Sequence, residues 1–355
     1  MSGTLRLDPA DSTLKRMENQ ELRARIISAA GQGRYREALL LLSGIEDLSA
    51  DEELERFSVP WRIAAFHEQA DGHGDLPQWP PQVADPFPGL KGLPEIPAAR
   101  LDAQVLAGAI LHHGGLLVRG LLAKHETDAL KAGTDRALDD FAQWIADPSA
   151  QPTPWFTALP LPADGPVAKG RSWLLSAGGV LGGDSPRMLL ELTGLLKKTG
   201  VREIVQDYFG EPPALSVGKS TFRKVSADLN NTAWHQDGAF LGKEIRSVNL
   251  WLALSPCGRD ASAIDLVPRR MNSIVETGTH NAEFDWCVGH GKVLELLQDD
   301  PIISPEFEAG DALLFDHMFL HRTSLPPQRK LDRWAIEAWM FAPSCYPMDQ
   351  MPLVI

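Results

Sequence analysis

The 355-residue sequence has little cysteine, an excess of acidic over basic residues and no long apolar run. Its three cysteines, Cys257, Cys287 and Cys345, are too few and too widely spaced for a disulfide framework or a thiolate zinc site. Lys and Arg total 34 against 47 Asp and Glu, and the resulting net charge of −13 argues against binding to nucleic acid or to anionic membranes. Because no stretch reaches about eighteen apolar residues and residues 1–22 lack an apolar signal-peptide core, we expect a cytoplasmic protein without a transmembrane segment.

The chain does contain enough apolar material for a large core, since 44% of its residues are hydrophobic. Seven prolines and two glycines fall within residues 75–97, where neither a helix nor a central strand can persist. We therefore divide the chain into a helical N-terminal extension (1–74), a Pro-rich linker (75–97) and a main domain (98–355). Helical spacing over residues 19–47 predicts a helix pair, which either packs on the main domain or forms a partner-binding module.

Helices precede strands in the main domain. The spacing of apolar residues predicts helices over 101–110 and 125–145, with a short strand at 116–119 between them. From about residue 214, short β-rich runs are separated by Gly, Pro, Asn and Asp clusters; these runs are 215–225, 247–254, 263–267, 312–319 and 334–341. This order favours an α+β protein with a sandwich or jelly-roll core over alternating βα units.

A His-x-Asp pair is the first candidate metal-binding motif. If residues 234–238 are extended, His235 and Asp237 project from one face of the strand and offer two adjacent ligands. A histidine from another strand would complete a 2-His-1-carboxylate set, which suits Fe(II). An apolar strand that begins near residue 310 leads to His317 and His321, and strand parity alone does not choose between these two histidines.

Arg333 opens the next predicted strand. An arginine buried near a metal pocket would bind a dicarboxylate through bidentate, charge-assisted hydrogen bonds. The alternative interpretation of Arg333 is a surface ion pair with Asp332 or Glu337.

Five motifs taken together resemble the phytanoyl-CoA dioxygenase family, within the Fe(II)/2-oxoglutarate-dependent dioxygenases. They are WHQDGAF (234–240), VNLWLAL (248–254), VPRR (267–270), GDALLFD (310–316) and HRT (321–323). The similarity to bacterial members of the family covers about residues 95–345. The resemblance implies a double-stranded β-helix, which is a cupin-like jelly roll flanked by helices. It also implies Fe(II), 2-oxoglutarate as co-substrate, and O2.

The resemblance assigns roles to eight residues of this sequence. The family's distal histidine precedes a small hydroxyl residue, which matches His321 rather than His317. The metal ligands would be His235, Asp237 and His321, and the residues around 2-oxoglutarate would be Arg333, Thr323, Trp251, Lys219 and Arg223. Arg329 is the alternative to Arg333, but it follows two prolines in a predicted loop. Since the co-substrate is anionic and the protein acidic, we expect a locally basic pocket.

The implied reaction is hydroxylation of a small molecule, with release of succinate and CO2. Related halogenases replace the carboxylate ligand with a small residue, whereas this chain retains Asp237, which favours hydroxylation or another oxidative outcome such as desaturation. The family acts on varied small molecules, and Arg171 and Arg187 are candidates for binding an anionic group of the substrate. Two other classes of function remain open: a cupin-like metal-dependent hydrolase or isomerase, and an inactive jelly-roll binding protein whose N-terminal helices bind a partner.

Overall fold

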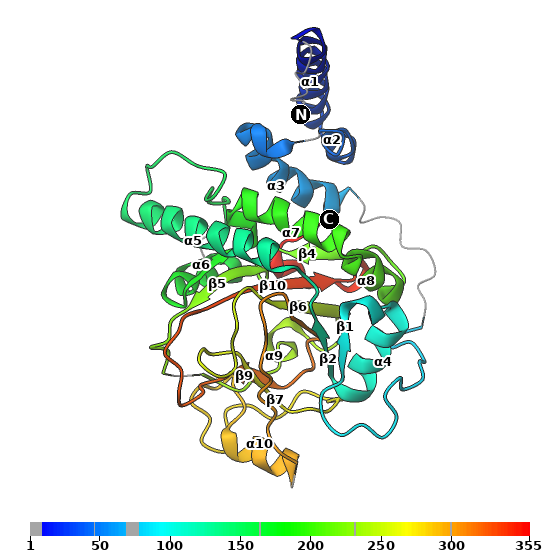
Figure 1. Ribbon diagram of the computed structural model, residues 1–355, viewed down its shortest axis with the longest axis vertical. Helices are drawn as coiled ribbons and strands as arrows, with labels where there is room; N and C mark the ends of the chain where they lie inside the picture. The colour runs from blue at the N-terminus through cyan, green and yellow to red at the C-terminus, as the bar shows by residue number, and fades with distance from the viewer. Residues whose placement is uncertain (1–8, 46, 69–77, 163–164, 231, 299) are drawn as a thin grey trace, which may run out of the picture.

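A large mixed sheet is covered by helices on one face and by a small second sheet on the other (Figure 1). The computed structural model describes residues 9–45, 47–68, 78–162, 165–230, 232–298 and 300–355. Its helices are α1 (Pro9–Gly31), α2 (Tyr35–Leu42), α3 (Glu52–His67), α4 (Ala103–His113), α5 (Lys124–Ala146), α6 (Pro166–Ser176), α7 (Pro186–Lys198), α8 (Val201–Phe209), α9 (Gly238–Leu241) and α10 (His290–Leu297). In the described part of the chain, no helix combines the length and apolar character needed to cross a membrane.

The strands form two sheets. The large sheet has the order β1-β2-β8-β6-β10-β4-β11, with β5 pairing with β10 and β3 pairing with β5. Its strands are β1 (Glu95–Pro97), β2 (Gly115–Arg119), β3 (Gly179–Leu181), β4 (Ala214–Ser216), β5 (Thr221–Val225), β6 (Ser247–Ala253), β8 (Ala312–Phe315), β10 (Arg333–Phe341) and β11 (Pro352–Val354). All of these pair antiparallel except β1 with β2. The small sheet is the antiparallel pair β7 (Ile264–Leu266) and β9 (His321–Thr323).

Alternation along the central strands separates two apolar layers. On β10, Ile336 and Met340 pack into the core that the helices cover, whereas Ala335 and Trp339 face the core shared with the small sheet. Successive side chains of a strand point to opposite faces, so each strand contributes to both layers. Both faces of the central strands β6 and β8 are covered, so all of their residues are buried, and these residues are apolar except Ser247 and Asn249 of β6.

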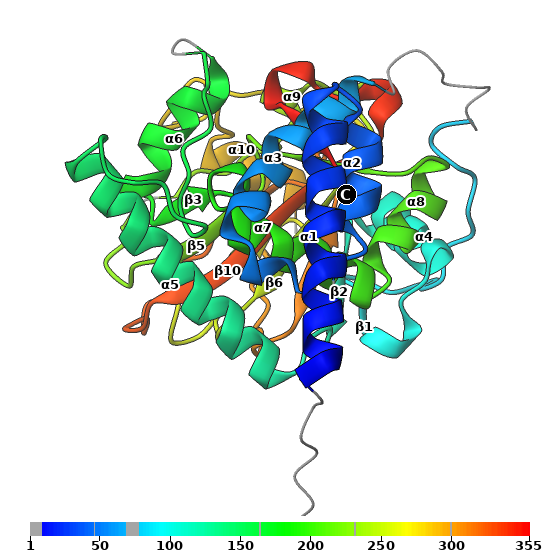
Figure 2. The same cartoon turned by 90° about the horizontal axis from the view of Figure 1, so that it is seen from above.

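The N-terminal helices pack against the rest of the chain. Helix α3 contacts β11 and α7, and Figure 2 shows α1, α2 and α3 lying over α7. Phe66 at the end of α3 is buried, with its ring centroid 5.5 Å from that of Tyr346. Arg187 of α7 pairs with the fully buried carboxylate of Glu55 on α3, with Nη2 and Oε2 2.7 Å apart. The helix pair expected within residues 19–47 is confirmed as α1 and α2.

Most of the other elements expected from the sequence are also confirmed. The predicted helices and the short strand before residue 150 correspond to α4, β2 and α5. The run 215–225 is two strands rather than one, because the chain turns between β4 and β5. Strand β1 lies at the end of the Pro-rich segment and pairs with β2; residues 75–77 of that segment lie outside the described residues. Helices α6, α7 and α8 were not predicted from the sequence.

Gly310 explains one of the sequence motifs. It adopts φ +97°, and a Cβ there would lie 2.1 Å from the carbonyl oxygen of Leu122. No side chain fits at that distance, so the turn into β8 requires glycine. Its neighbour Asp311 accepts hydrogen bonds from the backbone N–H groups of Gly120 and Glu308, both at 2.9 Å. The Gly-Asp pair therefore fixes the start of the strand that leads to His321.

Candidate metal centre

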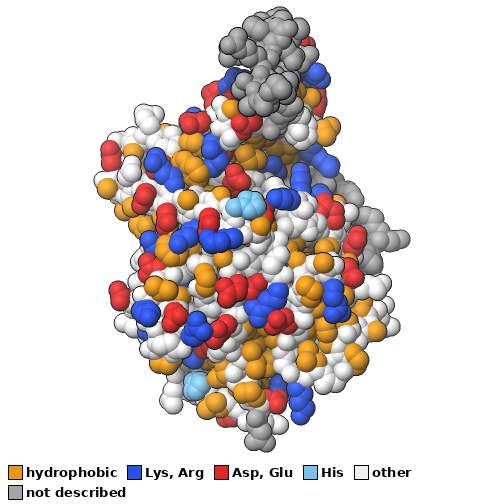
Figure 3. Space-filling view, in the orientation of Figure 1, with side chains coloured by type: hydrophobic (Ala, Val, Ile, Leu, Met, Phe, Trp, Pro, Cys, Tyr) orange, Lys and Arg blue, Asp and Glu red, His pale blue; other side chains and the backbone are white. Residues whose placement is uncertain are grey.

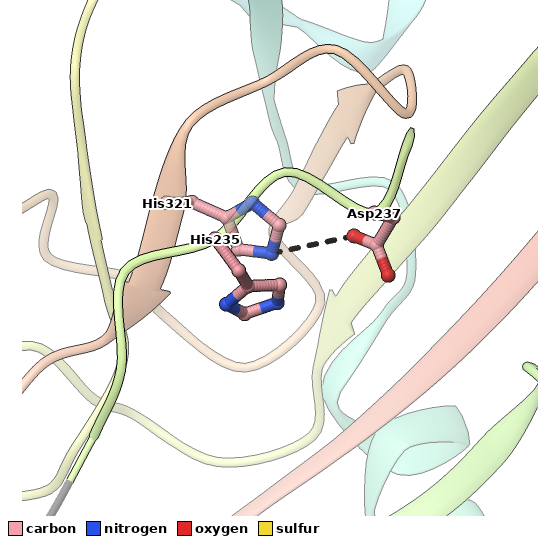
Figure 4. A group of neighbouring side chains, drawn as sticks. All are labelled: His235, Asp237 and His321. Carbon is pink, nitrogen blue, oxygen red and sulfur yellow. Dashed lines mark ion pairs between the residues drawn. The ribbon is translucent and has the colours of Figure 1, made fainter. Parts of the chain in front are cut away.

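His235, Asp237 and His321 converge between the two sheets (Figure 4). Their candidate ligand atoms all lie within 4.8 Å of one another, and no other such group of three is found among the described residues. The backbones of His235 and His321 form an antiparallel bridge with hydrogen bonds of 2.9 and 3.1 Å. Nε2 of His321 lies 3.8 Å from Oδ2 of Asp237. The backbone thus joins His235 to His321, 86 positions further along the chain, and a side-chain contact joins Asp237 to the same histidine.

The neighbours of the His-x-Asp pair are anchored in the opposite direction. The buried Trp234 belongs to a third apolar cluster with Val288 and Leu320. The Gln236 amide donates to the carbonyl of Met318 at 2.7 Å and accepts from the backbone N–H of Val275 at 2.7 Å. Because Trp234 and Gln236 are fixed on one side, His235 and Asp237 project on the other.

The expectation that residues 234–238 are extended is wrong at its last two positions, Asp237 and Gly238. Asp237 has helical dihedral angles (φ −61°, ψ −27°), and α9 begins at the next residue. The chain turns here because the N–H of Gly238 donates to the carbonyl of His317 at 2.8 Å. A Cβ on Gly238 would lie only 3.0 Å from the His317 ring, so glycine permits this close approach. The turn still leaves the carboxylate of Asp237 facing His235.

Both imidazoles of the triad have a defined tautomer. Nδ1 of His235 lies 3.0 Å from the carbonyl oxygen of Ala233, and Nδ1 of His321 lies 2.9 Å from that of Phe319. A carbonyl oxygen only accepts, so each Nδ1 carries the proton and each Nε2 keeps its lone pair. Histidines that bind metals in proteins are commonly oriented by such a hydrogen bond on the second nitrogen.

The charge states of the triad suit a divalent cation. Burial lowers the pKa of His321 to about 4, with His235 acting in the same direction, so His321 is neutral near pH 7. Burial would raise the pKa of Asp237, but Lys219 and the two histidines outweigh it and bring this pKa to about 2. Two imidazoles and one carboxylate are a donor set that fits Fe(II).

Arg333 is a buried cation without a full set of partners. Its residue is 1% exposed, and among the described residues no hydrogen-bond acceptor serves its Nε or Nη2. Its Cζ lies 5.2 Å from the ring centroid of Trp251. Burial lowers the pKa of Arg333 to about 10, and nearby Arg223 adds to this effect. The alternative of a surface ion pair is therefore excluded, and the free N–H groups match what a ligand carboxylate would accept.

Arg329 has a different environment from Arg333. Its guanidinium donates to the carbonyl oxygens of Leu229 at 2.9 Å and Ala227 at 3.2 Å. These hydrogen bonds close a loop, which matches the loop expected from the two preceding prolines.

Lys219 and Arg223 are each paired with a carboxylate in the same region. Lys219 Nζ lies 2.6 Å from Oδ1 of Asp237, and Nη1 of Arg223 lies 3.0 Å from Oε1 of Glu337. Strand register places Arg223 of β5 opposite Ala335 of β10. Arg333 and Glu337 lie two residues before and after Ala335, so Arg223, Arg333 and Glu337 share one face of the sheet. Burial would raise the pKa of Glu337, but Arg223, Arg333 and Lys219 outweigh it and hold this pKa below its usual range.

Three cations therefore face two carboxylates in this region, which leaves it locally basic. The outer surface differs, since Figure 3 shows acidic and basic side chains interspersed over the face that it draws.

Trp251 and Thr323 lie on strands that border the triad. Trp251 is buried on β6, with its ring centroid 4.9 Å from that of Phe307. Thr323 lies on β9 two residues after His321, so the two side chains share a face of the small sheet. His317, by contrast, is held by the Ser247 hydroxyl, 2.9 Å from its Nδ1.

The two arginines considered for an anionic substrate are held elsewhere. Arg171 makes a two-pronged contact with the buried carboxylate of Asp184, at 2.6 and 2.7 Å, and Arg187 pairs with Glu55. No contact given for the described residues links either arginine to the triad. A buried carboxylate left without its arginine is costly, so both pairs serve packing between elements.

The sequence analysis missed the aromatic residues beside His235. Phe240 and Trp286 have ring centroids 6.2 and 6.1 Å from that of His235. Trp286 lies 51 positions further along the chain in a segment without regular periodicity, so no pattern placed it at the site.

Comparison with known proteins places the chain in a family. The phytanoyl-CoA dioxygenase (PhyH) family model matches residues 111–325, which is more than half of the chain. The chain belongs to this family, whose metal, co-substrate and oxidant are Fe(II), 2-oxoglutarate and O2. No curated protein sequence matches the chain.

Several solved structures are similar to this chain at low identity. AviO1 from Streptomyces viridochromogenes Tue57 is 16% identical with a TM-score of 0.41, covering 69% of this chain and 97% of AviO1. The α-ketoglutarate-dependent carbocyclase SnoK from nogalamycin biosynthesis is 13% identical, with a TM-score of 0.45. The match covers 69% of this chain and 85% of SnoK. EctD from S. alaskensis, crystallised with 2-oxoglutarate and 5-hydroxyectoine, is 14% identical, with a TM-score of 0.45. The match covers 66% of this chain and 73% of EctD.

Proposed function

We propose that this chain hydroxylates a small molecule, using Fe(II), 2-oxoglutarate and O2 and releasing succinate and CO2. The observation that carries the proposal is a triad of two imidazoles and one carboxylate near Arg333, whose buried Nε and Nη2 find no acceptor among the described residues. Bound iron and co-substrate supply the oxidising power needed for an unactivated C–H bond. The carboxylate of Asp237 occupies the position that halogenases leave to chloride, which favours hydroxylation.

The roles of the individual residues follow from this proposal. His235 and His321 would bind iron through Nε2, and Asp237 through a carboxylate oxygen. Arg333, assisted by Thr323, would bind the distal carboxylate of 2-oxoglutarate. A bidentate pair there would satisfy the N–H groups that the described residues leave without acceptors.

Lys219, Arg223 and Trp251 would support the ligands and the co-substrate. Lys219 holds the carboxylate of Asp237 and so orients a metal ligand. Arg223 keeps Glu337 ionised beside Arg333, and both cations add to the field that attracts an anionic co-substrate. The Trp251 ring packs against the guanidinium of Arg333, where it would limit access of water to the ion pair between Arg333 and 2-oxoglutarate.

We further propose that the large and small sheets are the two sheets of a double-stranded β-helix. In this arrangement residues 98–355 form the dioxygenase domain, residues 1–74 a helical extension and residues 75–97 the linker. The buried pair of Glu55 and Arg187 favours an extension that packs on the domain over a free partner-binding module.

A substrate panel with isotope labelling tests the hydroxylase proposal. The iron-loaded protein is incubated with 2-oxoglutarate and candidate acids, thioesters and amines, and succinate is measured. A productive substrate should yield one succinate per product and incorporate one oxygen atom from ¹⁸O2. Turnover that needs neither 2-oxoglutarate nor O2 would instead indicate a metal-dependent hydrolase or isomerase. The Arg333→Gln variant should lose succinate release, and the matched Arg329→Gln variant should retain it.

A further inference from the structure

Three exposed aromatic side chains gather beside the triad. Phe240, Phe284 and Trp286, here called the aromatic mouth, are 45%, 45% and 46% exposed. They come from α9 and from the loop before α10, which are separate in the sequence. Large apolar side chains that cluster on a surface commonly mark a binding site, whereas scattered ones do not.

The rings of the aromatic mouth form a right-angled corner. Phe284 and Trp286 are parallel within 3°, with centroids 5.5 Å apart. Phe240 meets Trp286 at 82° and 6.5 Å. The His235 ring lies nearly parallel to Phe240, at 24° and 6.2 Å, and stands at 76° to Trp286. Two rings of the corner, Phe240 and Trp286, therefore contact His235, a ligand of the proposed metal.

His235 is the most exposed residue of the triad, and it is also the one that the aromatic mouth contacts. Asp237 and His321 are buried, whereas His235 is only half-buried. The ring contacts of His235 with Phe240 and Trp286 place the mouth on this more open side. A molecule bound beside His235 would therefore lie next to these rings.

We infer that the aromatic mouth binds the primary substrate and selects molecules with a flat, unsaturated ring. The inference rests on the proposed function, because it is the metal at the triad that makes this corner a substrate site. Rings at right angles offer one face for offset stacking and one edge for a T-shaped contact, and a planar ring uses both. A saturated chain gains only apolar contact area in the same place.

The small size of the aromatic mouth favours a small molecule over a second copy of the chain. Aromatic side chains bury about 150–250 Å² each, so three half-exposed rings offer roughly 300 Å². A stable protein interface needs about 800 Å² from each partner. A substrate of one to three rings matches the smaller area.

Two probes with the same carbon skeleton test the preference for planar rings. The neutral pair 2-naphthalenemethanol and decahydro-2-naphthalenemethanol avoids competition for Arg333. Saturation-transfer NMR on the metal-free protein should give the planar probe a dissociation constant about 3- to 10-fold lower. Equal affinities for the two probes would overturn the inference.

Leucine variants test the location of the probe. Phe284→Leu and Trp286→Leu should each weaken binding of the planar probe about 3- to 10-fold and leave the saturated probe nearly unchanged. Phe57→Leu is the matched control, because Phe57 is 43% exposed on α3, away from the triad. Unchanged affinity in both mouth variants, or self-association of wild type that these variants abolish, would contradict a substrate site.

A relaxation measurement separates this inference from the proposed function. In Mn(II)-loaded protein, the ring protons of the bound planar probe should relax faster, and His235→Ala should remove the effect. If the mouth variants fail to weaken the planar probe although 2-oxoglutarate still binds with the metal, the inference alone is wrong. If the metal does not bind at all while the planar probe does, the proposed function is wrong.

Discussion

At the residue scale, Arg333 is a buried cation whose Nε and Nη2 have no acceptor among the described residues. A buried guanidinium with free N–H groups costs several kcal/mol of folding free energy, because the charge has left water without full compensation. Arg333→Met should therefore raise the free energy of unfolding of the ligand-free protein by about 1–3 kcal/mol. The same variant should lose the thermal stabilisation that 2-oxoglutarate gives to the iron-loaded wild type. Paired thermal-shift scans with and without 2-oxoglutarate measure both effects.

Arg329→Met provides the control for this prediction. Arg329 serves loop carbonyls, so its loss should destabilise the loop without affecting the response to 2-oxoglutarate. An Arg333→Met protein that is still stabilised by 2-oxoglutarate to the wild-type extent would show that another cation binds the co-substrate.

His321 should make the metal-free protein sensitive to acid. Burial lowers its pKa in the folded state from 6.5 to about 4, so between these values the unfolded chain binds a proton that the folded chain does not. Stability therefore falls as the pH falls from 6.5 to 4, and this one residue contributes about 3 kcal/mol to the loss. In His321→Leu this contribution disappears, so the stability difference from wild type should change by that amount across the window.

Urea unfolding of the metal-free protein at several pH values measures the effect of His321. The exposed His125 offers the control. The free energy of unfolding of His125→Leu should depend on pH in the same way as that of wild type. If the stability difference between His321→Leu and wild type does not change with pH, His321 is not held neutral by burial.

At the scale of elements, the contact between α3 and α7 joins the N-terminal helices to the rest of the chain. Arg187→Leu leaves the Glu55 carboxylate buried and unpaired, and should lower the free energy of unfolding by about 3–5 kcal/mol. The double variant Glu55→Leu with Arg187→Leu should recover most of this loss, since it removes both charges. Denaturant unfolding measures these free energies.

Lys124→Leu, which removes an exposed i,i+4 ion pair on α5, should lower the free energy of unfolding by less than about 1 kcal/mol.

The Arg187 variants also test its two possible roles. If Arg187 serves only to pair with Glu55, the double variant should bind 2-oxoglutarate with iron as wild type does. A folded double variant that loses affinity for substrate while keeping affinity for 2-oxoglutarate would instead support the original assignment of Arg187 to the substrate.

Secondary structure was predictable wherever one period dominated a segment. The β-rich runs of β6 and β10, bounded by turn-forming residues, and the apolar spacing in α5 gave the correct elements. Helices α6 to α8 follow a loop that carries several prolines, and the sequence analysis assigned no regular structure there. The helical turn at Asp237 was also missed, since it depends on the carbonyl of His317, 80 residues away.

At the scale of the whole molecule, the candidate site was more predictable than its surroundings. The motifs that resemble the family named His235, Asp237 and His321, and the fold brings these three side chains together. The partners of the nearby cations could not be assigned from spacing. The turn between β4 and β5 brings Lys219 to Asp237, and the register of β5 against β10 brings Arg223 to Glu337. The expectation of a basic pocket in an acidic protein is consistent with this cluster of charges.

The most direct test of the account is the optical spectrum of the protein with Fe(II) and 2-oxoglutarate in the absence of oxygen. Wild type should develop a weak metal-to-ligand charge-transfer band in visible light that saturates with 2-oxoglutarate. The band should be absent in His235→Ala, and in Arg333→Gln it should need at least about 10-fold more 2-oxoglutarate, which corresponds to losing about 1.4 kcal/mol of binding. Absence of the band in wild type, or an unchanged band in His235→Ala, would contradict an iron and 2-oxoglutarate site at this triad.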